Sequence, residues 1–198
     1  MELNETSGRI NGLVNAGPGY SATVAPFEKV AAGTPDEQYD AIVTNVPFGG
    51  VADRGGNQLH DNRYQKEPLQ NYFILRSLEK LKPGGLAWIS EPVYAGNLNE
   101  VFKLFHDEKV VREAAFAAVC KAVDDGRLLL EKELFFNTRS FFENFEQFEQ
   151  RMIRVTHSNH QLSPELFEQV REKFDSFLTP EGATFLNPQR VDLLRKPA

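Results

Sequence analysis

The stretch Tyr39-Asp-Ala-Ile-Val-Thr-Asn-Val-Pro-Phe-Gly-Gly50 joins a short apolar run to a polar and aromatic ending. The run Ala41–Val43 directly follows Asp40, and such a run is typical of a strand that is buried on both faces of a parallel sheet. This strand would deliver Asn45 to its carboxyl end. Ligands of open α/β sheets bind at that edge, so the stretch predicts both an α/β fold and the place of a functional site.

Asn45, Val46, Pro47 and Phe48 bring together groups that are suited to holding a planar amine. The Asn45 side-chain oxygen and the Val46 backbone carbonyl each accept a hydrogen bond, so together they can bind both hydrogens of an exocyclic –NH2 group. Phe48 offers a flat face for stacking of a heterocyclic base, which is worth about 1–3 kcal/mol. Two acceptors also aim the nitrogen lone pair at an electrophilic methyl group. The alternative is a plain strand-ending turn, because Asn, Pro and Gly each favour turns.

This tetrad resembles the Asn-Pro-Pro-Phe/Tyr signature of class I S-adenosylmethionine-dependent amino methyltransferases, especially the adenine-specific DNA methyltransferases. Val46 departs from the signature, since it stands where that family usually carries its first proline, but only the backbone carbonyl is used at this position. The resemblance implies S-adenosylmethionine as the cofactor and an exocyclic amine, adenine in DNA, as the methyl acceptor. It also implies catalytic roles for Asn45, Val46, Pro47 and Phe48.

The segments after the tetrad predict a loop, a helix, a turn and a second strand. A polar, glycine-rich loop over 51–67 precedes a helix over Leu69–Leu81, whose apolar residues recur at helical spacing. Pro83-Gly84-Gly85 ends this helix, and Leu86–Ser90 forms the next strand. In the family that the tetrad resembles, the same order connects the fourth and fifth strands.

Residues upstream of the tetrad resemble parts of the same family's cofactor site. Glu2 resembles the acidic residue on the ribose hydroxyls, and Phe27 and Glu28 resemble the loop around the cofactor adenine. The family normally opens with a strand and a glycine-rich loop, but Gly17-Pro18-Gly19-Tyr20 follows a helical pattern and is interpreted as a turn. We therefore expect the sheet to lack its first strand, and a partner or a missing N-terminal segment to complete the cofactor site.

The second half predicts the rest of the sheet, with a helical insertion before the last strand. The pattern predicts helices over 101–105 and 107–123, a strand over Arg127–Phe136, a helix over 140–157 that opens with the capping box Ser140-Phe-Phe-Glu143, a helix from Ser163-Pro164, and a strand over Phe185–Leu194. The last strand can pair with Arg127–Phe136. This order resembles the sixth and seventh strands of class I methyltransferases.

Together these elements predict a single α/β domain over residues 1–198 with a Rossmann-like class I methyltransferase sheet. Residues 1–96 would carry the cofactor and acceptor sites, and residues 97–198 would complete the sheet, with the insertion at 140–178. Glu91–Gly96 and Arg190–Leu194 resemble general class I methyltransferases that act on small molecules more than a DNA-specific target domain.

The charge balance leaves the methyl acceptor open. The chain has 22 Lys+Arg against 28 Asp+Glu and a net charge of −6, whereas free-standing DNA-binding domains usually carry a basic surface. One alternative is a class I methyltransferase that acts on a small molecule or a protein. Another is a non-catalytic remnant or interaction module that keeps the fold without binding the cofactor.

Composition gives expectations for location and metal binding. The single cysteine, Cys120, excludes an internal disulfide, and no signal peptide or membrane-spanning run is evident, so we expect a cytoplasmic protein that does not enter a membrane. His106, His157 and His160 lack the partner spacing of a metal site, so we expect no metal. The oligomeric state does not follow from the sequence.

Overall fold

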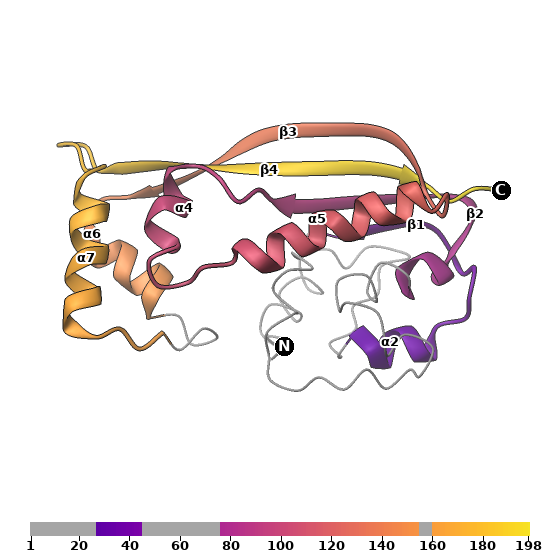
Figure 1. The fold of residues 1–198 in the computed structure, drawn as a ribbon, viewed down its shortest axis with the longest axis horizontal. Coiled ribbons are helices and arrows are strands. Elements are labelled where there is room, and N and C mark those ends of the chain that lie inside the picture. The colour runs from indigo at the N-terminus through magenta and orange to yellow at the C-terminus, as the bar shows by residue number, and fades with distance from the viewer. Residues whose placement is uncertain (1–26, 45–75, 155–159) are drawn as a thin grey trace, which may run out of the picture.

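The computed structural model describes residues 27–44, 76–154 and 160–198, which form a mixed α/β structure (Figure 1). Its sheet has the strand order β1-β2-β4-β3. The strands are β1 (Tyr39–Thr44), β2 (Leu81–Pro92), β3 (Leu129–Phe142) and β4 (Ala183–Arg195). β1 and β2 are parallel, and β4 is antiparallel to both β2 and β3. The strands β1, β2 and β3 run parallel to one another and follow chain order across the sheet, as in one half of a doubly wound sheet. The strand β4 lies antiparallel between β2 and β3. The predicted Rossmann-like α/β class is confirmed.

The helices lie between and beside these strands. They are α2 (Phe27–Gly33), a turn of helix at 76–80, α4 (Asn97–Phe102), α5 (Lys109–Asp124), α6 (Phe145–Phe148), the π-helical η3 (Glu149–Ile153) and α7 (Pro164–Asp175). Within the described ranges, none of the helices has both the length and the apolar character needed to cross a membrane.

The predicted helix that ends at Leu81 stops earlier, because Leu81 already belongs to β2. Leu81 pairs with Tyr39, and the next ladder pair is Ala41 with Leu86, so residues 82–85 bulge out of the ladder. Gly84 has a φ of 72°, in the left-handed region that favours glycine. The predicted Pro-Gly-Gly turn is therefore a bulge inside a strand. Residues 69–75 lie outside the described residues.

The predicted pairing of the last two strands is confirmed, but β3 runs six residues beyond Phe136. Ser140 pairs with Phe185 in this ladder, so the predicted helix start at Ser140 is wrong. The helix α6 begins after Asn144, whose side-chain oxygen accepts a hydrogen bond from the Gln147 backbone N–H at 2.9 Å. A continuous backbone ladder satisfies more polar groups than one local cap does, which explains the outcome.

A first hydrophobic core lies between α5 and one face of the sheet. The buried stripe of α5 consists of Ala115, Ala118, Val119 and Ala122, packed with β2 and β4 side chains. Small side chains let the helix approach the sheet closely. Val110, at the start of the helix, is exposed.

The opposite face of the sheet is open in the part of the chain that the structure describes. Val43 is 65% exposed, and its cross-strand neighbour Trp88 is also exposed. The prediction that Ala41–Val43 is buried on both faces is therefore wrong. The reason is topological, because β1 is an edge strand of the described sheet and α5 packs on the other face.

A second core, rich in phenylalanine, lies at the far end of the β3–β4 ribbon. Residues 183–188 of β4 pair with β3 but not with β2, so the ribbon extends past the rest of the sheet, and α4, α6 and α7 gather at its end (Figure 1). Ser163 caps α7 by accepting a hydrogen bond from the Leu166 backbone N–H at 3.2 Å, as its place before Pro164 predicts. The rings of Phe142, Phe145, Phe148 and Phe185 surround that of Phe174, at centroid distances between 5.1 and 6.2 Å.

Truncation of Phe174 tests the importance of this core. Phe174 is fully buried, so Phe174→Ala should lower the free energy of unfolding by about 3–5 kcal/mol, through lost burial and the cavity left behind. Urea unfolding followed by circular dichroism measures the change. Leu178→Ala is the matched control, because Leu178 is exposed just beyond α7, and it should cost less than about 1 kcal/mol. Equal losses in the two variants would contradict this account.

Candidate functional site

The carboxyl ends of β1 and β2 meet at one edge of the sheet. β1 ends at Thr44, which pairs with Ile89, and β2 continues to Pro92. The chain therefore leaves β1 at the edge where ligands of open α/β sheets bind. The structure therefore describes the strand that precedes the predicted tetrad, but not the tetrad.

The predicted site residues themselves lie outside the described residues. Asn45, Val46, Pro47 and Phe48 follow Thr44 within the segment 45–75, and Glu2 lies within 1–26. Phe27 and Glu28 open α2, but their side chains are not described. The catalytic and cofactor-binding roles given to these residues stay predictions.

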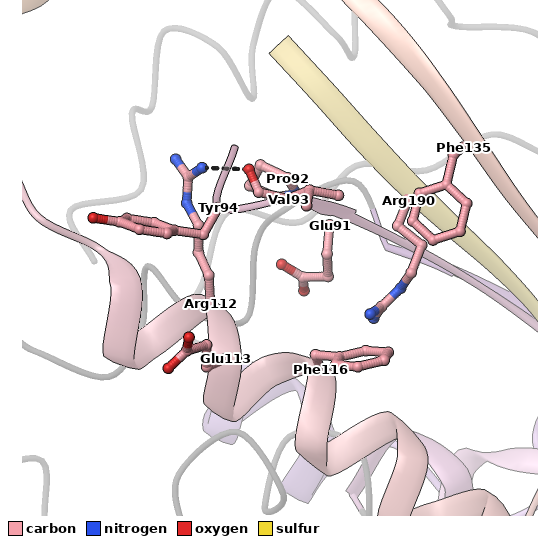
Figure 2. A pocket seen from close by; sticks show the side chains of 9 residues that line it. All are labelled: Glu91, Pro92, Val93, Tyr94, Arg112, Glu113, Phe116, Phe135 and Arg190. Atoms are coloured by element: carbon pink, nitrogen blue, oxygen red, sulfur yellow. Dashed lines mark hydrogen bonds between the residues drawn. The ribbon is translucent and has the colours of Figure 1, made fainter. Parts of the chain in front are cut away.

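A cavity of about 280 Å³ opens at the same edge, between the end of β2 and the helix α5 (Figure 2). Four elements line it, because β3 and β4 also contribute side chains. The lining residues are Glu91, Pro92, Val93, Tyr94, Arg112, Glu113, Phe116, Phe135 and Arg190. We call this cavity the Arg190 pocket.

Arg190 is the buried cation of this pocket. Its Nε donates a hydrogen bond to Asp192 Oδ2 at 2.8 Å, and its guanidinium carbon lies 4.0 Å from the centre of the Phe116 ring. Among the described residues, its Nη2 has no hydrogen-bond partner. Figure 2 shows the Arg190 and Glu91 side chains pointing into the space above Phe116. The guanidinium thus carries one buried donor without a partner among the described residues.

Asp192 is buried beside Arg190 on the same face of the sheet. Burial raises the pKa of Asp192, and the Glu133 carboxylate raises it further, although Arg190 acts in the opposite direction. The 2.8 Å distance to Arg190 makes the two groups an ion pair, and burial together with the Glu133 carboxylate outweighs the effect of this pair on the pKa of Asp192. A buried pair of this kind adds little to stability. Its position at the ligand-binding edge makes it a candidate functional group.

Arg112 fixes the other wall of the Arg190 pocket. Its Nη1 donates to the Val93 carbonyl at 3.1 Å, and its Nε and Nη2 donate to Glu108 Oε2 at 3.0 and 2.6 Å. A hydrogen bond with His106, together with those from Arg112, lowers the pKa of Glu108 to about 2. The turn after β2 is therefore tied to the start of α5 by charge-assisted hydrogen bonds.

These groups suit a planar, polar ligand. Phe116 and Phe135 offer aromatic faces, Arg190 offers hydrogen-bond donors, and Glu91, which pairs across the strands with Arg190, supplies carboxylate oxygens. Within the described ranges, no cluster of His, Cys, Asp or Glu could hold a metal ion. The described side chains can thus bind and orient a heterocycle or a similar group.

Sequence reasoning missed the Arg190 pocket, although one signal was present. Arg190 and Asp192 alternate with apolar residues in the last strand, which places both charges on one face. A charged pair on the inner face of a strand predicts a buried ion pair. Arg112 gave no comparable signal, because a charged residue in an amphipathic helix is usually solvated.

Comparison of the sequence with known proteins finds a match to part of a phage protein. No protein-family model matches the chain. It is 41% identical over 92 residues to "Defense against restriction protein B" of Escherichia phage P1, a match that covers 46% of this chain and 4% of the length of that relative.

Two solved structures share the fold at low sequence identity. One is a Bacillus halodurans protein with a methyltransferase designation (15% identity, TM-score 0.55, 99% of this chain and 81% of that chain). The other is the YcgJ protein of Bacillus subtilis (12% identity, TM-score 0.57, 99% and 80% of the two chains). The chain therefore shares the Rossmann-like α/β fold of these two structures.

Removal of Asp192 should expose the cost of burying Arg190 alone. Asp192→Ala leaves the guanidinium without its counter-charge and should lower the free energy of unfolding by about 3–5 kcal/mol. The double variant Arg190→Met, Asp192→Leu should unfold within about 2 kcal/mol of the original chain, because no buried charge remains. Urea unfolding of Arg190→Met, Asp192→Leu, the double variant and the original chain forms a double-mutant cycle, and strictly additive losses would show that the two side chains do not interact.

The low pKa of Glu108 predicts a pH dependence of stability. A carboxyl whose pKa falls from 4.5 to about 2 on folding stabilises the folded chain by up to about 3 kcal/mol above pH 4.5, and this is lost as the pH falls towards 2. Glu108→Gln should therefore be less stable at pH 7 and approach the original chain near pH 2. Glu113→Gln, at an exposed site on the same helix, should change stability by about 0–1 kcal/mol at either pH. Unfolding curves between pH 7 and 2 measure both effects.

Proposed function

We propose that this chain carries the acceptor site of an S-adenosylmethionine-dependent methyltransferase that methylates an exocyclic amine of a DNA base, adenine in particular. The observation that carries the proposal is the position of Thr44. It ends a strand of a methyltransferase-like sheet at the ligand-binding edge, and the next residue is Asn45 of the amine-binding tetrad.

In the proposed reaction, the tetrad holds the amine. The Asn45 amide oxygen and the Val46 carbonyl accept the two amine hydrogens, Pro47 stiffens the turn, and Phe48 stacks on the base. The nitrogen lone pair is then aimed out of the base plane towards the methyl donor. S-adenosylmethionine, when bound, supplies that electrophilic methyl group. A base in duplex DNA must leave the stack to reach such a site.

The phage relative supports DNA as the substrate. Its name refers to defence against restriction. Restriction depends on recognition of DNA, and the N6 amine of adenine is one of the hydrogen-bond donors that proteins read in the major groove. A methyl group on this nitrogen changes the donor that such a protein reads. Methylation of an exocyclic amine would therefore be a direct means of defence.

The cofactor site of the proposal rests on Glu2, Phe27 and Glu28. Glu2 would contact the ribose hydroxyls, and Phe27 and Glu28 would surround the adenine ring. Among the described residues at the carboxyl edge there is no glycine-rich loop of the kind that binds nucleotides. We propose that polypeptide outside these 198 residues completes this site, and the same polypeptide would supply the positive charge for DNA, because this chain has a net charge of −6.

A small-molecule acceptor is the second candidate. The Arg190 pocket favours it, since a cavity of about 280 Å³ with aromatic faces and a buried guanidinium can enclose a small heterocycle. The acidic surface fits this reading as well. The two candidates differ in the product, so one assay separates them.

Replacement of Asn45 tests the proposal. Asn45→Ala removes one of the two acceptors for the amine and should lower methyl transfer by about 100-fold or more, while folding is unchanged. The measurement is N6-methyladenine, by mass spectrometry of nucleosides from DNA incubated with S-adenosylmethionine and with the chain together with the polypeptide that completes its cofactor site. Gln161→Ala is the control, since Gln161 is an exposed amide away from the sheet edge, and it should keep the original rate.

Three results would contradict the proposal in different ways. Equal rates in Asn45→Ala and the original chain would remove the role of the tetrad. Methylation of metabolites but not of DNA would favour the small-molecule acceptor. Absence of both saturable S-adenosylmethionine binding in calorimetry and methyl transfer, with the completing polypeptide present, would favour a non-catalytic interaction module.

A further inference from the structure

The strand β3 forms the outer edge of the described sheet (Figure 1). It is fourteen residues long, and in the ranges that the structure describes, no strand pairs with its outer backbone edge. Its large apolar side chains are exposed along most of this length: Leu129, Leu130, Leu134, Phe135, Phe136 and Phe141. Long, apolar edge strands are templates for pairing with another strand.

The centre of β3 indicates which kind of partner fits. Leu134, Phe135 and Phe136 are consecutive, and they are 41%, 64% and 47% exposed. Because neighbouring side chains in a strand point to opposite faces, a helix lying on one face would leave either Phe135 or its two neighbours uncovered. A strand that adds to the edge contacts side chains on both faces at once. The surface therefore fits a strand.

We propose that the partner strand is β3 of a second copy of this chain, paired antiparallel about a two-fold axis at Phe135. The charges of the strand support a second copy. Its first half carries Glu131, Lys132 and Glu133, with a net charge of −1, and its second half carries Arg139, with a charge of +1. Antiparallel pairing brings the acidic half of each strand beside the basic half of the other, as an isologous interface requires.

The register follows from the alternation of side chains. Two-fold pairing must be centred on a residue, because paired residues have to point to the same face. A centre at Leu134 sets Lys132 opposite the partner's Phe136, and a centre at Phe136 sets Phe135 opposite the partner's Asn137. A centre at Phe135 sets Leu134 opposite the partner's Phe136 and Phe135 opposite itself. Of these three centres, only Phe135 matches the central apolar side chains with one another on both faces, and it also sets Glu131 opposite the partner's Arg139.

This dimer would add a residue to the Arg190 pocket. Phe135 lines the pocket, and it pairs across the strands with Arg190. In the proposed register, the partner's Phe135 lies directly beside it on the same face of the sheet. The two pockets of the dimer would then share an aromatic wall at the axis. The inference does not rest on the proposed methyl transfer.

Cysteine cross-linking tests both the interface and its register. Residues facing each other in an antiparallel pair have Cα atoms about 4.5–5.5 Å apart, within the range that a disulfide bridges. In a Cys120→Ser background, Phe135→Cys should therefore form disulfide-linked dimers under mild oxidation. Phe135 is exposed, so the substitution is compatible with folding, and circular dichroism verifies this.

Thr138→Cys in the same background is the matched control. It lies on the same strand and is also exposed, but in the proposed register the two cysteines are six residues apart along the sheet, or about 20 Å. Cross-linking at 135 should be at least about ten times faster than at 138. Equal rates, faster linking of Phe136→Cys, or a monomeric mass for the original chain in light scattering at 100 μM would each overturn the proposal.

Discussion

Backbone hydrogen bonds along both edges of β4 hold the described structure together. One edge pairs with β2 and the other with β3, so every ladder that joins the two halves of the sheet passes through this strand. Its first part carries Ala183 and Phe185 into the phenylalanine core, and its last part carries Leu194 into the core beneath α5. Because ladder hydrogen bonds cannot be lost without exposing or orphaning backbone polar groups, loss of β4 would undo both cores. The strand also positions the buried Arg190 and Asp192.

The sequence predicts elements best where one side-chain period acts alone. Alternation in the last strand and the proline cap at Ser163-Pro164 were sufficient to locate β4 and α7. Prediction failed where a distant strand competes with a local signal, because Ser140 carries the sequence signal of a helix cap but lies opposite Phe185 in the fold. The predicted helix end at Leu81 was wrong for the same reason, since Leu81 pairs with Tyr39, which is far away in the chain. The predicted burial of Val43 was wrong because burial depends on which helices cover each face of the sheet, and the strand's own sequence does not determine this.

Some residues of the candidate site could be identified from the sequence, and others could not. Asn45 and Phe48 were identified from their chemistry and from the strand before them, and the structure fixes only that this strand ends at Thr44. Arg190 and Asp192 were not identified, because the alternation in the last strand places both charges on one face but does not show that α5 covers that face. Burial matters here, since a raised Asp192 pKa means that the ion pair is kept at a cost to stability. Groups that are held at such a cost beside a ligand-binding edge are stronger functional candidates than solvated charges.

The two open parts of the sheet have different physical requirements. At β1, Val43 and Trp88 are exposed on one face of a parallel pair, and parallel sheets are normally covered on both faces. At β3, consecutive apolar residues are exposed on both faces and the backbone edge is open in the described part of the chain, which favours a strand. These edges lie at opposite ends of the four-strand order. Pairing of two copies through β3 would therefore leave β1 and its carboxyl edge accessible, so dimerisation and completion of the nucleotide-binding half are compatible within one assembly.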